Sequence, residues 1–217
     1  MSNYASARTH MIDSQLRPNE VNDERIIAAI VKVPREKFVP KIKRSIAYVD
    51  EDLAIGNGRY LMEPVIFARL LVAADIKPTD LVLDVGCSTG YSSAVMASLA
   101  DAVVALEEDE ELADAAERKL SEQDIMNVAV VKGTLNQGVS KQGPYDVIFL
   151  QGAVDEIPAV LVKQLKEDGR LMCVKLEGGV GRAHMVTREH DKFVGRNLFD
   201  ANVQRLPGFE KETTFVF

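Results

Sequence analysis

Cysteine is scarce in this sequence, and long apolar runs and a net positive charge are missing. The two cysteines, Cys87 and Cys173, lie in unrelated contexts, which excludes a disulfide framework and fits a reducing cytoplasm. No apolar run approaches the roughly 18 residues that span a bilayer. The first residues, MSNYASARTH, lack a cationic start before an apolar stretch, so we expect no secretory signal. We therefore expect a cytoplasmic protein without a membrane partner.

The charge balance excludes further classes of protein. The formal net charge is −7, and much of the acid lies in EEDEEL (107–112), so a nucleic-acid partner is disfavoured because phosphate contacts need clustered Lys and Arg. The pattern G-x-x-x-x-G-K-[ST] is absent, which counts against a nucleoside triphosphate ligand. His10, His184 and His190 show no metal-ligand spacing with acids or cysteines, so we expect no metal site.

The first third of the chain predicts two helices. NDERIIAAIVKV (22–33) has apolar residues at helical spacing and stops at Pro34. PVIFARLLVAADI (64–76) predicts a second helix with Pro64 at its first position. The stretch between them, 35–63, is expected to be irregular, with turns at its glycines.

From residue 80 onward the pattern alternates between short apolar runs and helical periodicity. The expected strands are 81–85, 103–106, 127–131, 145–150 and 169–176, the expected helices are 90–100, 109–123 and 157–165, and 183–189, 192–199 and 212–217 are expected antiparallel strands. Unbroken apolar strands that alternate with helices indicate a parallel sheet covered on both faces. We therefore expect a single doubly wound α/β domain over 1–217, with a helical and loop segment at 1–63 and the α/β core at 64–217.

The stretch LVLDVGCSTGY (81–91) is the most informative motif. In a doubly wound sheet, ligands bind beyond the carboxyl ends of the strands, at the first strand–loop–helix crossing. Gly86 and Gly90 allow a sharp turn there, and Asp84 ends the strand. Glu107 ends the next strand, seventeen residues after Gly90, where such folds place an acid that holds ribose hydroxyls. A tight turn without a ligand is the alternative, but the complete set favours a nucleotide-like ligand.

The motif DVGCSTGY, with an acid closing the next strand, resembles class I S-adenosylmethionine-dependent methyltransferases. Further stretches, in chain order from about residue 11 to residue 175, resemble the protein-L-isoaspartate O-methyltransferase family: VPREKFVP (33–40), AYVDEDLAIGNGR (47–59), NVAVVKG (127–133) and YDVIFLQGAVDEIPAVLVKQLKEDGRL (145–171). VPRE-x-FVP together with AY-x-D is specific to that family among methyltransferases.

The resemblance implies a seven-stranded Rossmann-like sheet, S-adenosylmethionine as cofactor, and methyl transfer to the isoaspartyl carboxylate of a damaged protein or peptide. It places Asp84, Gly86 and Gly90 at the methionine end of the cofactor, with Cys87 and Ser88 in the same turn. Glu107 would hold the ribose, and Gly133 with Thr134 would lie against the adenine. Cys87 also has a simpler interpretation, as a small residue that fills a tight loop.

Several positions depart from the family pattern. Ser88 replaces the middle glycine of the turn, and Thr134 replaces an acid. The family's substrate loop reads G-Q-T-I-S-Q-P, whereas this chain reads GRYLMEP (58–64). Met62 therefore replaces the serine used at the reacting carboxylate, and Glu63 replaces a neutral glutamine.

The altered loop matters because transfer to an ionised carboxylate depends on positioning, which supplies about 7–11 kcal/mol of barrier reduction. An inward-facing Glu63 would repel that carboxylate by about 4 kcal/mol at 4 Å. Arg59 is expected to pair with Glu63 or with a substrate carboxylate. For Tyr60, Leu61 and Met62, substrate contact and simple packing are both open.

Three functions remain in competition. A nicotinamide dehydrogenase is a distant fourth. The leading hypothesis is the isoaspartyl methyltransferase. The second keeps the fold and cofactor but changes the acceptor to a different, small or apolar nucleophile, because GRYLMEP has lost its polar groups. The third is a non-catalytic protein that binds S-adenosylmethionine, for which Thr134 is a further argument.

Overall fold

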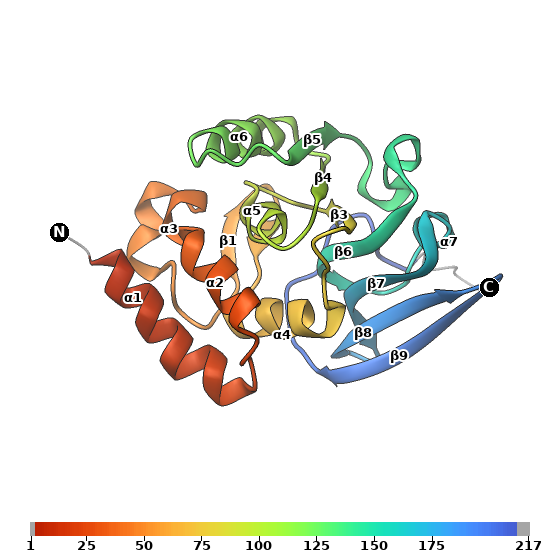
Figure 1. Ribbon diagram of the computed structural model, residues 1–217, viewed down its shortest axis with the longest axis horizontal. Coiled ribbons are helices and arrows are strands. Elements are labelled where there is room, and N and C mark those ends of the chain that lie inside the picture. Colours follow the sequence, from red (N-terminus) through yellow and green to blue (C-terminus); the bar gives the residue numbers. More distant parts are fainter. Residues whose placement is uncertain (1–2, 212–217) are drawn as a thin grey trace, which may run out of the picture.

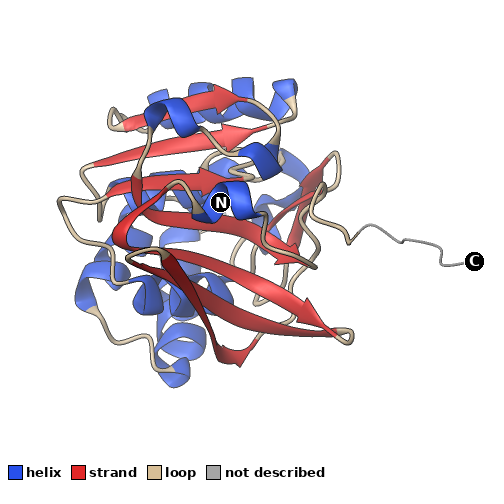
Figure 2. Cartoon of the chain, turned by 90° about the vertical axis from the view of Figure 1, so that its right-hand side faces the viewer, coloured by secondary structure: helices blue, strands red, loops and turns tan. Residues whose placement is uncertain are grey.

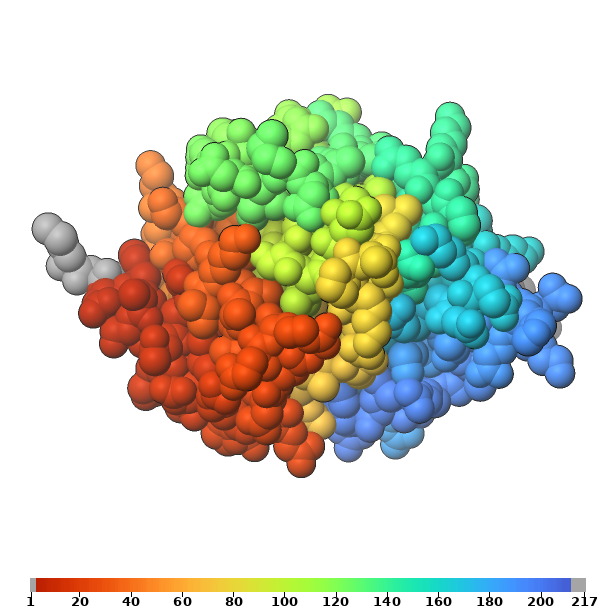
Figure 3. Space-filling model, in the orientation of Figure 1, coloured from red at the N-terminus to blue at the C-terminus, as the bar shows by residue number. Residues whose placement is uncertain are grey.

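The computed structural model describes residues 3–211. Helices and a small hairpin precede the main sheet: α1 (Tyr4–Met11), α2 (Glu24–Lys32), α3 (Arg35–Phe38), β1 (Leu53–Gly56), β2 (Arg59–Leu61) and α4 (Pro64–Ala74). Helical turns at Ile12–Leu16, Arg17–Asn19 and Lys41–Ile46 join them. The N-terminal segment packs against α4 and α5 and covers one side of the molecule (Figures 1 and 3).

The two helices predicted in this region are confirmed as α2, which is three residues shorter than expected, and α4, which is two residues shorter. The expectation that only two helices precede the sheet is wrong, because α1 and α3 also form. Helix α1 carries no apolar stripe and buries only Met11, so periodicity could not reveal it. The expectation of an irregular 35–63 is also wrong, since β1 and β2 pair as an antiparallel hairpin.

The core alternates strands and helices as predicted, although several of the predicted bounds differ. Its elements are β3 (Leu81–Val85), α5 (Tyr91–Ala97), β4 (Ala102–Glu107), α6 (Glu110–Ser121), β5 (Val128–Lys132), β6 (Tyr145–Val154), α7 (Ala159–Val162), β7 (Leu165–Glu177), β8 (Val180–Glu189) and β9 (Lys192–Asp200), with short helical turns at Leu135–Gln137 and Ser140–Gln142. The predicted helix at 157–165 forms only as the single turn of α7. The expected strand at 212–217 lies outside the described residues.

The main sheet has seven strands in the order β5-β4-β3-β6-β7-β8-β9. The first five strands run parallel, and β8 and β9 add to β7 as antiparallel neighbours. Figure 2 shows this sheet with most of the helices behind it. The predicted doubly wound sheet with antiparallel C-terminal strands is confirmed.

Burial on both faces explains why the central strands are unbroken apolar runs. Val82 belongs to the core cluster shared with α2, α4 and α5, whereas Leu83 and Val85 belong to the cluster on the other face, shared with α7. Alternate side chains of one strand point to opposite faces, so a strand covered on both faces needs apolar residues throughout.

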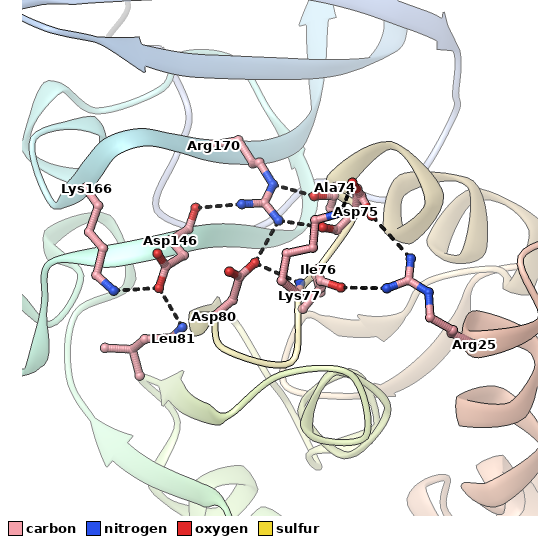
Figure 4. Close-up of polar contacts among 10 residues, drawn as sticks. All are labelled: Arg25, Ala74, Asp75, Ile76, Lys77, Asp80, Leu81, Asp146, Lys166 and Arg170. Carbon is pink, nitrogen blue, oxygen red and sulfur yellow. Dashed lines mark hydrogen bonds and ion pairs between the residues drawn. The ribbon is translucent and has the colours of Figure 1, made fainter.

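The amino-terminal edge of the sheet is held by a polar network (Figure 4). Arg170 on β7 donates to the carbonyls of Ala74 and Asp75 at the end of α4 and forms an ion pair with Asp80 (2.8 Å). Asp146 accepts from the Leu81 amide (2.7 Å) at the start of β3. These contacts fix α4 and three strands at the edge opposite the glycine turn, so they serve the fold.

Among residues 3–211, no helix combines the length and apolar character needed to cross a membrane.

Candidate functional site

The glycine turn follows β3 at the carboxyl edge of the sheet. Gly86, Ser88 and Gly90 all have positive φ (80°, 52° and 90°), which favours glycine and strains the serine. The amides of Gly86 and Cys87 donate to the Leu106 carbonyl of β4 (2.9 and 3.1 Å), and the Gly90 amide closes the turn on Cys87 (2.8 Å). The turn is therefore a rigid bend across two neighbouring strands.

The N-terminal segment supports this turn from the other side. Thr89 Oγ1 donates to the Phe38 carbonyl at the end of α3 (2.5 Å). Phe38 also packs edge-on against Tyr91, the first residue of α5, with ring centroids 5.8 Å apart. The stretch VPREKFVP thus has a physical role, because it fixes the position of the predicted cofactor turn.

Asp84 lies beneath the turn and is fully buried. Its carboxylate accepts from Ser92 Oγ (2.6 Å), Ser93 Oγ (2.5 Å) and Gln151 Nε2 (2.7 Å). Burial raises the pKa of Asp84 to about 6 despite these hydrogen bonds. The partners Ser92, Ser93 and Gln151 were missed by the sequence analysis, although a glutamine ending the apolar run YDVIFL was a signal that could have identified Gln151.

Glu107 ends β4 and is 0% exposed. Arg59 forms an ion pair with it from β2, with Nε and Nη2 both 3.0 Å from Oε1 and Nε 3.3 Å from Oε2. Three amides also donate to the same carboxylate: Ser88 to Oε2 (2.9 Å), and Glu108 (2.9 Å) and Asp109 (3.1 Å) to Oε1. Arg59 therefore pairs with Glu107 and not with Glu63, and its pairing with a substrate carboxylate stays a prediction.

The two residues predicted near the adenine lie next to this acid. The Gly133 amide donates to the Glu107 carbonyl (3.1 Å), which places Gly133 directly after β5 at the same edge of the sheet. Thr134 is exposed beside it. The structure thus brings Asp84, the glycine turn, Glu107 and Gly133 together, as the sequence predicted.

A segment that the sequence analysis left unassigned lies over the turn. We call residues 201–211 the C-terminal cover. It pairs with the end of β6, where the Ala153 amide donates to the Gln204 carbonyl (2.9 Å) and the Leu206 amide to the Ala153 carbonyl (2.8 Å). Leu206 is 2% exposed, and a Cβ placed on Gly86 would meet its Cδ1 at 2.7 Å. The cover therefore presses an apolar side chain onto the glycine turn.

The four substrate-loop positions have different environments. Tyr60 pairs with Ala54 across the β1–β2 hairpin. Leu61 and Met62 are buried in the main core cluster, and the carbonyl of Met62 accepts from the buried Arg35 (2.8 Å). Of the two interpretations left open for Leu61 and Met62, packing is the one that the structure displays.

Met62 can be tested as a packing residue. Its side chain is 5% exposed within the core, so replacing it with serine is expected to lower the free energy of unfolding by about 2–5 kcal/mol. Urea denaturation measures this loss. Met126, 87% exposed, is the matched control, for which the same change is expected to cost less than about 0.5 kcal/mol. Equal effects at the two positions would contradict the packing role.

Glu63 is the remaining loop position and occupies the N-cap position of α4, without a capping hydrogen bond from its side chain. Its amide donates to Asp52 Oδ1 (2.8 Å). Glu63 also lines a cavity together with Asp200 and with Gly179, which lies in the loop between β7 and β8. Burial first, and then the nearby acids Asp50, Asp52 and Glu51, together raise the pKa of Glu63 to about 7. Glu63 is therefore divided between its acid and carboxylate forms at neutral pH.

Two further kinds of reactive group, a thiolate and a metal centre, find no support in the described part of the chain. Burial raises the pKa of the Cys87 thiol well above its ordinary value, which disfavours the reactive thiolate. Among residues 3–211, no group of three His, Cys, Asp or Glu side chains is arranged to hold a metal ion.

Comparison with solved structures defines the class of protein. A protein-L-isoaspartate O-methyltransferase superimposes with a TM-score of 0.79 at 26% identity, over 94% of this chain and 66% of that chain. A putative protein-L-isoaspartate O-methyltransferase from Plasmodium falciparum, in complex with S-adenosyl-L-homocysteine, superimposes with a TM-score of 0.80. At 21% identity over 95% of this chain and 99% of that one, the second likeness shows the fold alone. The fold is that of a Rossmann-like methyltransferase.

Comparison with curated sequences defines the family. The family described as protein-L-isoaspartate(D-aspartate) O-methyltransferase matches residues 6–202. The protein-L-isoaspartate O-methyltransferase of Koribacter versatilis is 40% identical over 172 residues, which is 79% of this chain and 78% of that protein. That of Methanoculleus marisnigri is 38% identical over 165 residues, 76% of this chain and 75% of that protein. The chain belongs to the protein-L-isoaspartate(D-aspartate) O-methyltransferase family.

The described conformation accommodates the family's cofactor, S-adenosylmethionine, only in part. Ser88 Oγ is buried in the turn without a hydrogen-bond partner in the described part of the chain, as a ligand site would leave it. The two positions most needed for binding are engaged, however: Glu107 by Arg59 and Gly86 by Leu206. The residues at these two positions therefore do not fit the cofactor as they lie.

Proposed function

We propose that the protein is an S-adenosylmethionine-dependent O-methyltransferase that transfers a methyl group to the isoaspartyl carboxylate of damaged proteins, which starts their repair. The observation that carries the proposal is the match to the family over residues 6–202. It is supported by the arrangement of Asp84 and Glu107 at the carboxyl ends of neighbouring parallel strands, on either side of the glycine turn. Ligands of doubly wound sheets bind at this edge.

The side chains that could hold the methyl-accepting carboxylate in this chain differ from the hydroxyl and amide of the family loop. Met62 offers no donor, and Glu63 offers one only in its acid form. Because burial and neighbouring acids raise the pKa of Glu63 to about 7, its protonated carboxyl can donate one hydrogen bond to an acceptor carboxylate. Glu63 is thus the side chain that we assign to holding the isoaspartyl group.

Transfer of labelled methyl from S-adenosylmethionine to an isoaspartyl peptide tests the proposal. The expected result is a base-labile methyl ester on the isoaspartyl peptide and none on the matched aspartyl peptide. Circular dichroism of the same preparation establishes that the protein is folded. Folded protein that labels neither peptide, while binding S-adenosylhomocysteine, would contradict the isoaspartyl activity.

A second candidate function keeps the fold and cofactor but changes the acceptor. It is favoured by the acidic surroundings of Glu63, since Asp50, Glu51, Asp52 and Asp200 lie near it. Carboxylates that repel an anionic acceptor attract an amine or tolerate a neutral group. Labelling of an amine-bearing or neutral acceptor in the same assay, with none on the isoaspartyl peptide, would favour this alternative.

A further inference from the structure

The acceptor capacity of Glu107 is already used by the chain itself. A carboxylate offers about four lone-pair sites on its two oxygens. In this structure it receives three amides, from Ser88, Glu108 and Asp109, and the guanidinium fork of Arg59. A ribose hydroxyl that is to bind Glu107 needs at least one free acceptor site on this carboxylate. It cannot bind there while Arg59 contacts both oxygens. With Arg59 withdrawn, the three amides leave one site free, on Oε2.

The second obstruction comes from the C-terminal cover and lies against the first. Leu206 contacts Gly86, where the chain must be free of side chains for a ligand to approach it. Gly58, the neighbour of Arg59, lies close to Pro207, the neighbour of Leu206, since a Cβ on Gly58 would meet Pro207 Cγ at 3.5 Å. The hairpin and the cover therefore meet above the turn, and each brings one side chain into it.

Both obstructing segments have a backbone that allows them to move. The hairpin turn before Arg59 contains three consecutive residues of positive φ: Gly56 (142°), Asn57 (51°) and Gly58 (73°). Gly208 in the cover has φ +87°, and no described atom lies within 4 Å of where its Cβ would be, as is also true of Gly56. Glycines with no neighbouring atoms can change φ and ψ without steric clashes. Short movements of these segments can therefore withdraw Arg59 from Glu107 and Leu206 from Gly86.

We propose that Arg59 and Leu206 form an internal plug of the cofactor pocket, so that S-adenosylmethionine or S-adenosylhomocysteine binds only after Arg59 leaves Glu107. The inference rests on the proposed function. The plug and the ribose diol compete for one carboxylate, so the apparent dissociation constant equals the intrinsic constant divided by the open fraction of the protein. If the pocket is open in one molecule in a hundred, affinity is lowered about a hundredfold.

Binding of S-adenosylhomocysteine to wild-type protein and to the Arg59→Gln variant tests the plug. Glutamine is the residue at this position in the family pattern G-Q-T-I-S-Q-P, and it lacks the cationic fork. Isothermal titration is expected to show a dissociation constant at least about tenfold lower for the variant, if no more than a tenth of the wild-type molecules are open. Arg17→Gln is the matched control, because it removes the same charge from an exposed ion pair with Glu24. Its dissociation constant is expected to equal that of the wild type.

The possible outcomes separate the plug from the proposed function. Binding of equal strength by wild type and Arg59→Gln would overturn the plug and leave the methyltransferase function standing. Binding by neither at millimolar ligand would overturn both. Tighter binding by Arg59→Gln than by the wild type, with Arg17→Gln binding like the wild type, supports the plug.

A measurement on the wild type covers the case in which the variant does not fold. The Arg59 Nε–H is buried and hydrogen-bonded to Glu107, so its proton is expected to exchange slowly with solvent in nitrogen-15 NMR spectra of free protein. Addition of saturating S-adenosylhomocysteine is expected to shift that signal or make it exchange rapidly. An Arg59 signal that stays unchanged in the ligand-bound protein would overturn the plug, because the guanidinium would then still hold Glu107.

Discussion

Replacing Glu107 with alanine is expected to lower the free energy of unfolding by about 3–5 kcal/mol, the usual cost of removing one partner of a buried ion pair. Arg59 is 6% exposed and would keep a buried charge without its carboxylate. The amides of Ser88, Glu108 and Asp109 would lose their acceptor at the same time. Urea denaturation at pH 7, without cofactor, measures the loss.

An exposed ion pair provides the matched control for this change. Asp114 on α6 pairs with Lys132 at the protein surface (2.6 Å), and Asp114→Ala is expected to cost at most about 1 kcal/mol. If Glu107→Ala costs no more than this control, Arg59 must reach water in the folded protein. The buried pair would then be contradicted, and the plug with it.

The fold was largely predictable because its core strands are covered on both faces. The run 103–106 is apolar and buried throughout for that reason, and the intervening helices show their periodicity. The β1–β2 hairpin was missed because its strands are too short to establish alternation. The pair Asn57–Gly58 between them is a known hairpin signal, and combined with the flanking residues it could have been recognised. Helix α1 depends on its cap at Asn3 more than on an apolar face.

The candidate site was predictable only as far as topology determines it. Asp84 and Glu107 end adjacent parallel strands, so a rule about strand ends brings them together. The partner of Glu107 follows no such rule, because Arg59 lies 48 residues away on a hairpin whose position depends on tertiary packing. The contact of Leu206 with Gly86 likewise depends on how the end of the described chain crosses β6. Motif spacing shows which backbone positions form a pocket, but it does not show which side chains fill it.

Methylation of an isoaspartyl peptide is expected to fall about tenfold in kcat/KM between pH 6 and pH 8, following the acid form of Glu63. Burial, aided by Asp50, Asp52 and Glu51, raises the pKa of Glu63 from 4.5 to about 7. Below pH 7 the carboxyl is protonated and donates a hydrogen bond to the acceptor. Above pH 7 it is a carboxylate and repels the acceptor, which is ionised over the whole range.

Glu63→Gln separates this cause from other titrating groups. Glutamine donates at every pH, so the variant is expected to keep its pH 6 rate up to pH 8. Glu51→Gln is the matched control: it removes a neighbouring negative charge that raises the pKa of Glu63, so the decline should remain but move to lower pH. Asp200, in the same cavity, and Arg35, which lies near Asp52, keep their charges in both variants. A decline that survives Glu63→Gln unchanged would place the titrating group elsewhere and remove Glu63 from the acceptor site.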